Sequence, residues 1–177
     1  MVLAPREINQ HKIKENTENL EQSRQSFVVA HDTQCHKVMV KVFKGTSSFS
    51  SDLLCNVKDG KVYKKLSGYS SDVICNIKGN KIYKGLSGYS SDVICNIQNG
   101  KVYKGNSSYS SDVILHISNG KIYKGNSSYS SDVIANIDGS RIKSGTSSYS
   151  SDTKFNIDGP LTTEEFIAVW FAINYIF

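Results

Sequence analysis

The residues that could do chemistry in this chain recur at intervals of twenty. One aspartate falls in each interval, at Asp52, Asp72, Asp92, Asp112, Asp132 and Asp152. A ring of six carboxylates could hold a cation, but each aspartate lacks a second ligand in its interval, and calcium takes about six to eight oxygens. Aspartate after two serines and before a strand is also a common turn residue that bonds neighbouring backbone N–H groups. We therefore expect a structural role, with no metal and no cofactor.

Aromatic residues form two further series at the same interval. The linker series is Phe49, Tyr69, Tyr89, Tyr109, Tyr129 and Tyr149, and the strand series is Phe43, Tyr63, Tyr83, Tyr103 and Tyr123. Strand aromatics usually pack across strands. The linker tyrosines stand beside serines and could stack on a sugar or another flat ligand, so they are the candidate ligand-binding residues. The competing interpretation, which the sequence favours, is that they pack in the core and keep their hydroxyls in water.

Catalytic signatures are missing from the repeated units. His36 and His116 occupy a strand position that is otherwise asparagine, at Asn56, Asn76, Asn96, Asn136 and Asn156. An asparagine repeated at one strand position predicts a side-chain hydrogen-bond ladder, in which the histidines are tolerated substitutes. The sequence has no nucleophile–base pair, phosphate loop or metal motif, and no unique polar cluster breaks the repetition. We therefore predict no catalytic residues.

The four cysteines share one position of the repeat. Cys35, Cys55, Cys75 and Cys95 align with Leu115, Ala135 and Phe155. A position that accepts all four residue types is a core position, where free cysteine behaves as a small hydrophobe. Zinc sites need paired ligands such as Cys-x-x-Cys, which are absent. We expect reduced, buried thiols, which favours a reducing compartment. With no signal peptide recognisable, a cytoplasmic location is the expectation.

The twenty-residue unit that positions these residues is predicted to form a β-hairpin. The segment 72–77 alternates and is rich in β-branched residues, as strands are, with Val73, Cys75 and Ile77 expected on one face. Residues 78–80 supply a tight turn, as Asn-Gly and Asp-Gly do in other copies, and residues 81–84 form a second short strand. An isolated hairpin is marginal in water, so each copy must pack against its neighbours.

Three segments make up the chain. Residues 1–26 are a polar arm, helical or disordered; residues 27–159 are the hairpin repeats, with a degenerate first copy; residues 160–177 form a C-terminal helix of the same domain. That helix opens with a capping box at residues 162–165 and is apolar nearly all round over residues 166–173, so it must be buried. The repeats predict a pseudo-symmetric ring or funnel plugged by the helix. The alternative is a β-solenoid with a helical cap.

Composition limits the functional classes. The net charge of +5 comes from one or two lysines per copy, without the basic cluster or motif of a nucleic-acid-binding domain. No apolar run reaches the roughly 18 residues of a membrane span. We expect a non-enzymatic binding or scaffold module that displays repeated Tyr, Ser and Lys groups to a glycan or protein. The alternative is an enzyme or small-ligand binder with a site at the ring axis.

One family shares both the repeat and the tail. Tandem copies of Ser-x-Asp-Val-x-x-x-Ile-x-x-Gly-Lys-Ile-Tyr-Lys-Gly precede Asp-Gly-x-Leu-Thr-x-x-Glu-Phe-x-Ala-x-Trp, which here spans residues 158–170. This combination resembles the five-fold β-flower proteins of bacteria, over roughly residues 38–177. The resemblance implies a funnel of hairpins around a pseudo-symmetry axis and carries no biochemical activity with it. The chain departs from the five-fold pattern in having six aligned positions for each strand type.

Overall fold

The computed structural model describes residues 39–176 and shows twelve strands in that range. The long strands are β2 (Leu53–Lys58), β4 (Val73–Lys78), β6 (Val93–Gln98), β8 (Val113–Ser118), β10 (Val133–Asp138) and β12 (Thr153–Asp158). The short strands are β1 (Val40–Lys44), β3 (Lys61–Lys64), β5 (Lys81–Lys84), β7 (Lys101–Lys104), β9 (Lys121–Lys124) and β11 (Arg141–Ser144). The predicted arm (1–26), most of the degenerate first copy, Cys35 and His36 lie outside the described residues.

Each long strand from β2 to β10 forms a hairpin with the short strand that follows it, as the repeat predicts. In the hairpin of β4 and β5, Ile77 pairs with Ile82 and Lys78 with Lys81. The turn between them needs left-handed backbone, which Gly79 supplies with a φ of 59°. In the next copy Asn99 and Gly100 take φ values of 51° and 74°, the geometry of a type I′ hairpin turn.

A β-bulge separates each short strand from the next long strand. Between β3 and β4, Val62 pairs with Cys75 but Tyr63 pairs with Val73, so Ile74 has no opposite residue. The same shift recurs at the other five junctions. The bulge changes which side chains face inward: Ile74, rather than Val73, joins Cys75 and Ile77 in the core. The predicted inward set of Val73, Cys75 and Ile77 is therefore wrong at its first member.

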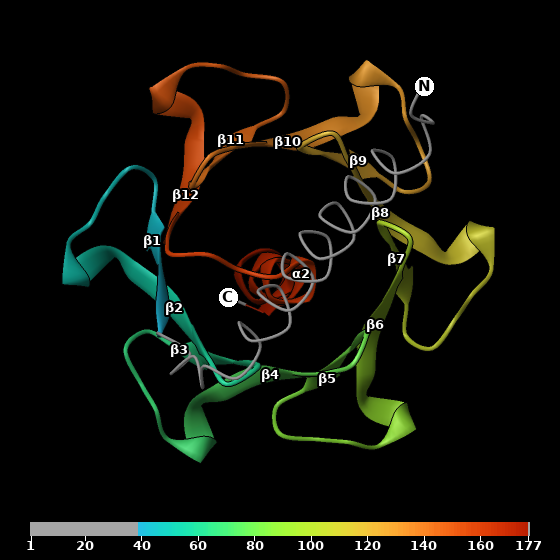
Figure 1. Cartoon of the computed structure of the whole chain (residues 1–177), viewed down its shortest axis with the longest axis horizontal. Helices are drawn as coiled ribbons and strands as arrows, with labels where there is room; N and C mark the ends of the chain where they lie inside the picture. Colours follow the sequence, from blue (N-terminus) through green and yellow to red (C-terminus); the bar gives the residue numbers. More distant parts are fainter. Residues whose placement is uncertain (1–38, 177) are drawn as a thin grey trace, which may run out of the picture. The chain divides into compact units, whose positions relative to one another are not determined.

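The sheet closes because the first described strand pairs with the last. Strand β1 pairs antiparallel with β12, with Val42 opposite Ile157 and Lys41 opposite Asp158, which is the hairpin register of every other copy. The result is a closed antiparallel barrel of twelve strands, seen down its axis in Figure 1. The expectation of a hairpin ring is confirmed and the solenoid is excluded. The five-fold count implied by the resemblance is wrong, because β12 and β1 together make a sixth hairpin.

The C-terminal helix lies inside the barrel and packs against β2 to β5. The helix α2 (Thr163–Phe171) continues into a π-helical turn, η8 (Ala172–Ile176), and it starts at the predicted capping box of Thr162 and Glu165. Figure 1 shows α2 surrounded by the strands. Its side chains are buried from Glu165 through Ala172, and they meet an inner wall in which the short-strand residues Val42, Val62, Ile82, Val102, Ile122 and Ile142 are fully buried. The helix and the barrel thus share one core.

Candidate functional site

The linker aromatics are the most exposed large hydrophobic side chains among residues 39–176. Each stands just before a short 3-10 turn, as Tyr69 precedes η3 (Ser70–Asp72), in a loop that projects outward from the barrel in Figure 1. Phe49, Tyr69, Tyr89, Tyr109, Tyr129 and Tyr149 are between 73% and 77% exposed. Core packing, the interpretation that the sequence favoured, is therefore wrong for this series. By contrast, the strand aromatics Phe43, Tyr63 and Tyr123 are buried, and Tyr83 and Tyr103 are half-buried.

A repeated hydrogen-bond motif holds each aromatic loop in place. The Ser67 hydroxyl donates to Asp72 Oδ2 at 2.5 Å and accepts a bond from the backbone N–H of Tyr69 at 3.2 Å. The backbone N–H of Asp72 then donates to the carbonyl of Tyr69, which closes the turn. All six loops carry this arrangement. The aspartates are structural, as expected, although their carboxylates bond a serine hydroxyl rather than a backbone N–H.

The repeated asparagines tie each loop to the barrel. Asn56 Nδ2 donates to the carbonyls of Lys65 and Ser67, at 2.7 and 2.8 Å, and the other asparagines of the series bond equivalent carbonyls. The predicted asparagine ladder is wrong, because these side chains bond loop backbone instead of each other. His116 is the substitute that the sequence indicated. Its Nδ1–H donates to the Ser127 carbonyl at 3.0 Å, since a carbonyl oxygen can only accept.

The loops offer stacking surfaces rather than reactive groups. The exposed rings are flat, amphipathic and fixed at their backbone, while the neighbouring serine and aspartate side chains already bond each other. Within residues 39–176, no three His, Cys, Asp or Glu side chains come together as a possible metal site. Aromatic rings with a polar edge suit recognition of another surface. The six exposed rings are therefore candidate contact surfaces.

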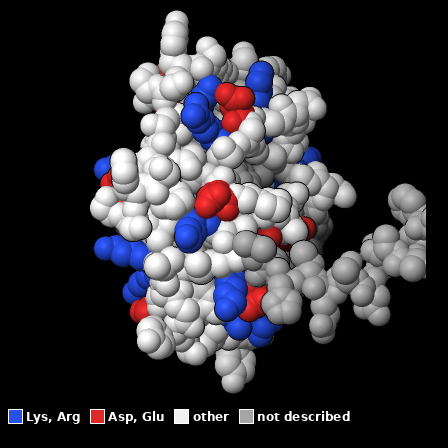
Figure 2. All heavy atoms as spheres, turned by 60° about the vertical axis from the view of Figure 1, so that its left-hand side comes forward, with Lys and Arg blue, Asp and Glu red and all other residues white. Residues whose placement is uncertain are grey.

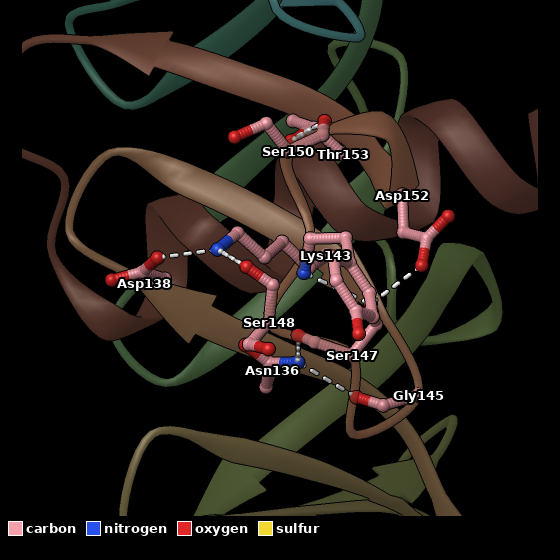
Figure 3. A network of polar contacts seen from close by, with 10 residues as sticks. Asn136, Asp138, Lys143, Gly145, Ser147, Ser148, Ser150, Asp152 and Thr153 are labelled. Carbon is pink, nitrogen blue, oxygen red and sulfur yellow. Dashed lines mark hydrogen bonds and ion pairs between the residues drawn. The ribbon is translucent and has the colours of Figure 1, made fainter.

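One copy breaks the symmetry with a charged pair that the sequence reasoning missed. Lys143 replaces the strand tyrosine and is 5% exposed. Its Nζ donates to Asp138 Oδ2 at 2.6 Å and to the Ser148 carbonyl at 2.8 Å (Figure 3). This hydrogen bond and the positive charge of Lys143 lower the pKa of Asp138. The sequence does contain a sign of this pair, because a lysine stands at the strand position where four other copies have tyrosine.

A pocket of about 300 Å³ lies inside the ring beside the start of α2. The helix packs against β2 to β5, and the pocket occupies the side facing β8, β10, β11 and β12. Its wall is largely apolar, with Ser140, Thr162 and Thr163 as the hydroxyl-bearing members, and its main apolar members are Ile117, Ile137, Ile142, Ile157, Leu161 and Phe166. A volume of this size is at the lower end for small-molecule sites.

The cysteines take no part in a site. Cys55, Cys75 and Cys95 are buried, free thiols on the inner wall, as predicted. Burial raises the pKa of each to about 12, and a nearby Cys75 adds to the effect on Cys55 and Cys95. Since the thiolate is the reactive form, these thiols are inert at neutral pH. Cys35 lies outside the described residues.

Comparison with known proteins places the ring in a described family. The family model described as "6-fold beta flower protein" matches residues 42–170. The match runs from the first strand of the ring to Trp170 in the plugging helix. Neither the comparison with curated proteins nor that with solved structures found a match.

Among residues 39–176, no helix combines the length and apolar character needed to cross a membrane.

Proposed function

The chain belongs to the six-fold β-flower family, and from this premise we propose that it is a non-enzymatic binding module whose loops present aromatic side chains to a partner. The observation that carries the proposal is the exposure of six equivalent rings, between 73% and 77%, on loops held by a repeated hydrogen-bond motif. Exposing a tyrosine ring forgoes the stability that its burial would give. Six such rings at equivalent positions are the pattern of a recognition surface.

Repetition suits a partner that itself repeats. A single aromatic contact is weak, but linked contacts raise overall affinity by about 10²–10⁴ when geometry allows simultaneous engagement. A glycan polymer or a multisubunit protein surface offers such repeated determinants. Glycans are tested first, because a ring with a hydroxyl edge beside serines can stack on a sugar face.

The test compares three proteins on a glycan array and in pull-downs. The first is the wild type, the second has Tyr69, Tyr89 and Tyr109 replaced by Ser, and the third has them replaced by Phe. Phe49 fills the same position in the native chain, so the Phe variant keeps the ring without disturbing the loop. Binding by wild type and the Phe variant, lost in the Ser variant, supports the proposal. Equal binding by all three proteins contradicts it.

A second candidate function rests on the pocket beside α2. Its volume of about 300 Å³ and its apolar wall favour a small apolar molecule with one polar end, which could bond the Thr162 or Ser140 hydroxyl. A thermal-shift screen with short-chain alcohols and fatty acids tests this function. Stabilisation by a ligand should disappear in Ile137→Trp, which fills the pocket, whereas stabilisation that persists in this variant rules the pocket out.

A further inference from the structure

A ring of lysines surrounds one opening of the barrel. The last residue of five short strands is an exposed lysine, at Lys44, Lys64, Lys84, Lys104 and Lys124, and Ser144 takes the sixth position. We infer that this end of the barrel docks on an anionic lipid surface, with the lysines contacting headgroups around the emerging helix. The inference does not rest on the loop tyrosines, although two exposed leucines of the same loops contribute to it.

Strand register places these lysines on the inner face of the barrel. Lys64 lies directly opposite Cys55, and Lys84 opposite Cys75. Residues directly opposite each other across an antiparallel pair share a face, and these cysteines are fully buried in the core. The remaining lysines lie opposite Cys95, Leu115 and Phe155, which are equally buried. The lysine side chains therefore continue the inner wall past its apolar layers and line the opening.

The strand ends that line the opening carry positive charges alone, and the six loop aspartates at this end of the barrel each bond a serine hydroxyl. Lys154 adds to the positive charge, because lysine replaces the isoleucine found in other copies and its Nζ stands 5.6 Å from the centroid of the Trp170 ring. No described strand carries a carboxylate on the inner face at this end. The side wall differs, since Lys and Arg lie interspersed with Asp and Glu there (Figure 2). A helix C-terminus carries only about half a negative charge. Neutralising the negative end of the α2 dipole therefore cannot account for five or six lysines.

The C-terminal helix extends through the same opening. Ala168 lies at the level of the lysine ring, since its carbonyl is 3.8 Å from the Cys75 sulfur. The helix continues to Ile176, and burial falls from Trp170 to the half-buried Ile173 and the exposed Asn174. Helix turns thus extend beyond the ring of charges.

Exposed leucines lie at the same end of the barrel. Leu66 and Leu86 follow the lysine-bearing strand ends and are 57% and 50% exposed. Apolar groups surrounded by lysines match the boundary between the headgroups and acyl chains of an anionic membrane. A nucleic acid would use the charges but would leave the apolar groups without a partner.

Vesicle sedimentation with two matched variants tests the inference. The protein is mixed with vesicles of phosphatidylcholine alone or of phosphatidylcholine with phosphatidylserine, at low and physiological salt. The inner variant carries Lys→Gln at Lys64, Lys84, Lys104 and Lys124. The outer variant carries Lys→Gln at Lys61, Lys81, Lys101 and Lys121, which belong to the same four copies but lie on the outer face beside the turns. Both variants lose the same charge.

We expect wild type and the outer variant to sediment with the phosphatidylserine vesicles and to stay soluble with phosphatidylcholine alone. Each lysine near an anionic surface is worth about 1 kcal/mol, so the inner variant, which loses four lysines, should lose on the order of a thousandfold in partitioning. Equal loss in both variants, or no sedimentation of the wild type, overturns the inference. Binding of single-stranded DNA through the inner lysines without vesicle binding also overturns it. If the inner variant does not fold, the pair Lys84→Gln and Lys104→Gln, against Lys81→Gln and Lys101→Gln, makes the same comparison.

Discussion

Two tyrosines of adjacent segments should differ widely in their contribution to stability. Tyr109 stands in a loop and is 74% exposed, whereas Tyr123 stands in β9 and is 9% exposed. Truncating each to alanine removes the same atoms from opposite environments. The comparison tests whether the loop aromatics are free to bind a partner.

The difference in free energy follows from the buried area. A tyrosine that buries about 200 Å² gains about 25 cal/mol per Å², or about 5 kcal/mol when nearly all of it is covered. Tyr123→Ala should therefore cost about 4 kcal/mol, within the range for aromatic truncation in cores. About a quarter of Tyr109 is covered, and part of that is main chain, so Tyr109→Ala should cost at most about 1 kcal/mol.

Equilibrium unfolding in urea, followed by intrinsic fluorescence, measures both changes on proteins that differ at one position. The m-value should stay constant, so that a shift in midpoint reports stability alone. A cost above about 2 kcal/mol for Tyr109→Ala would place its ring in the core and refute the exposed-loop geometry. A cost below about 2 kcal/mol for Tyr123→Ala would refute the area argument itself.

Three further outcomes are expected. Cys55, Cys75 and Cys95 should resist alkylation at pH 8 until the protein is denatured, because burial raises the pKa of each to about 12; modification of the native protein at any of them would contradict this. Trp170→Ala should destabilise the fold by about 3–5 kcal/mol in urea melts, because Trp170 is buried against Phe155 in the plugged barrel; an unchanged midpoint would show that the helix is dispensable. Lys143→Tyr, which restores the residue of four other copies, should leave stability at neutral pH unchanged or slightly raised, and it should remove the part of the acid sensitivity due to Asp138. The lowered pKa of that carboxyl stabilises the native protein above about pH 4 and is lost as the pH falls further. A strongly destabilised variant would show that Lys143 is required.

Local sequence patterns were sufficient to predict the hairpins, the turns and the helix. The alternation in residues 72–77, the Asn-Gly turns and the capping box at Thr162 each depend on a few neighbouring residues. The choice of Ile74 over Val73 for the core could not be read in this way, because a bulge is a relation between two strands and appears only once β3 pairs with β4. The sixth hairpin likewise depends on a pairing between residues more than a hundred positions apart.

The candidate site depended on contacts that the sequence pattern does not express. The exposure of Tyr69 depends on the hydrogen bonds that Asn56 donates to the backbone carbonyls of Lys65 and Ser67, which lie 9 and 11 positions later in the chain. Hydrophobicity alone assigned the ring to the core. The lysine ring could be predicted from the alternation of side chains along a strand, since Lys64 stands two residues after the buried Val62. That prediction first requires the inner face of the short strands to be known.

The closure of β1 on β12 has a consequence for how the protein assembles during synthesis. Until the ribosome has delivered residue 158, the growing sheet has two open edges and no plug, a state prone to pairing with other chains. Because the hairpins are nearly identical, a hairpin that pairs with a copy other than its native neighbour has nearly the same energy as one that pairs correctly. The C-terminal helix favours one of these pairings, because its buried side chains pack on the inner wall of β2 to β5 in the closed barrel. A segment that follows the hairpins in the chain thus contributes to the choice of their pairing.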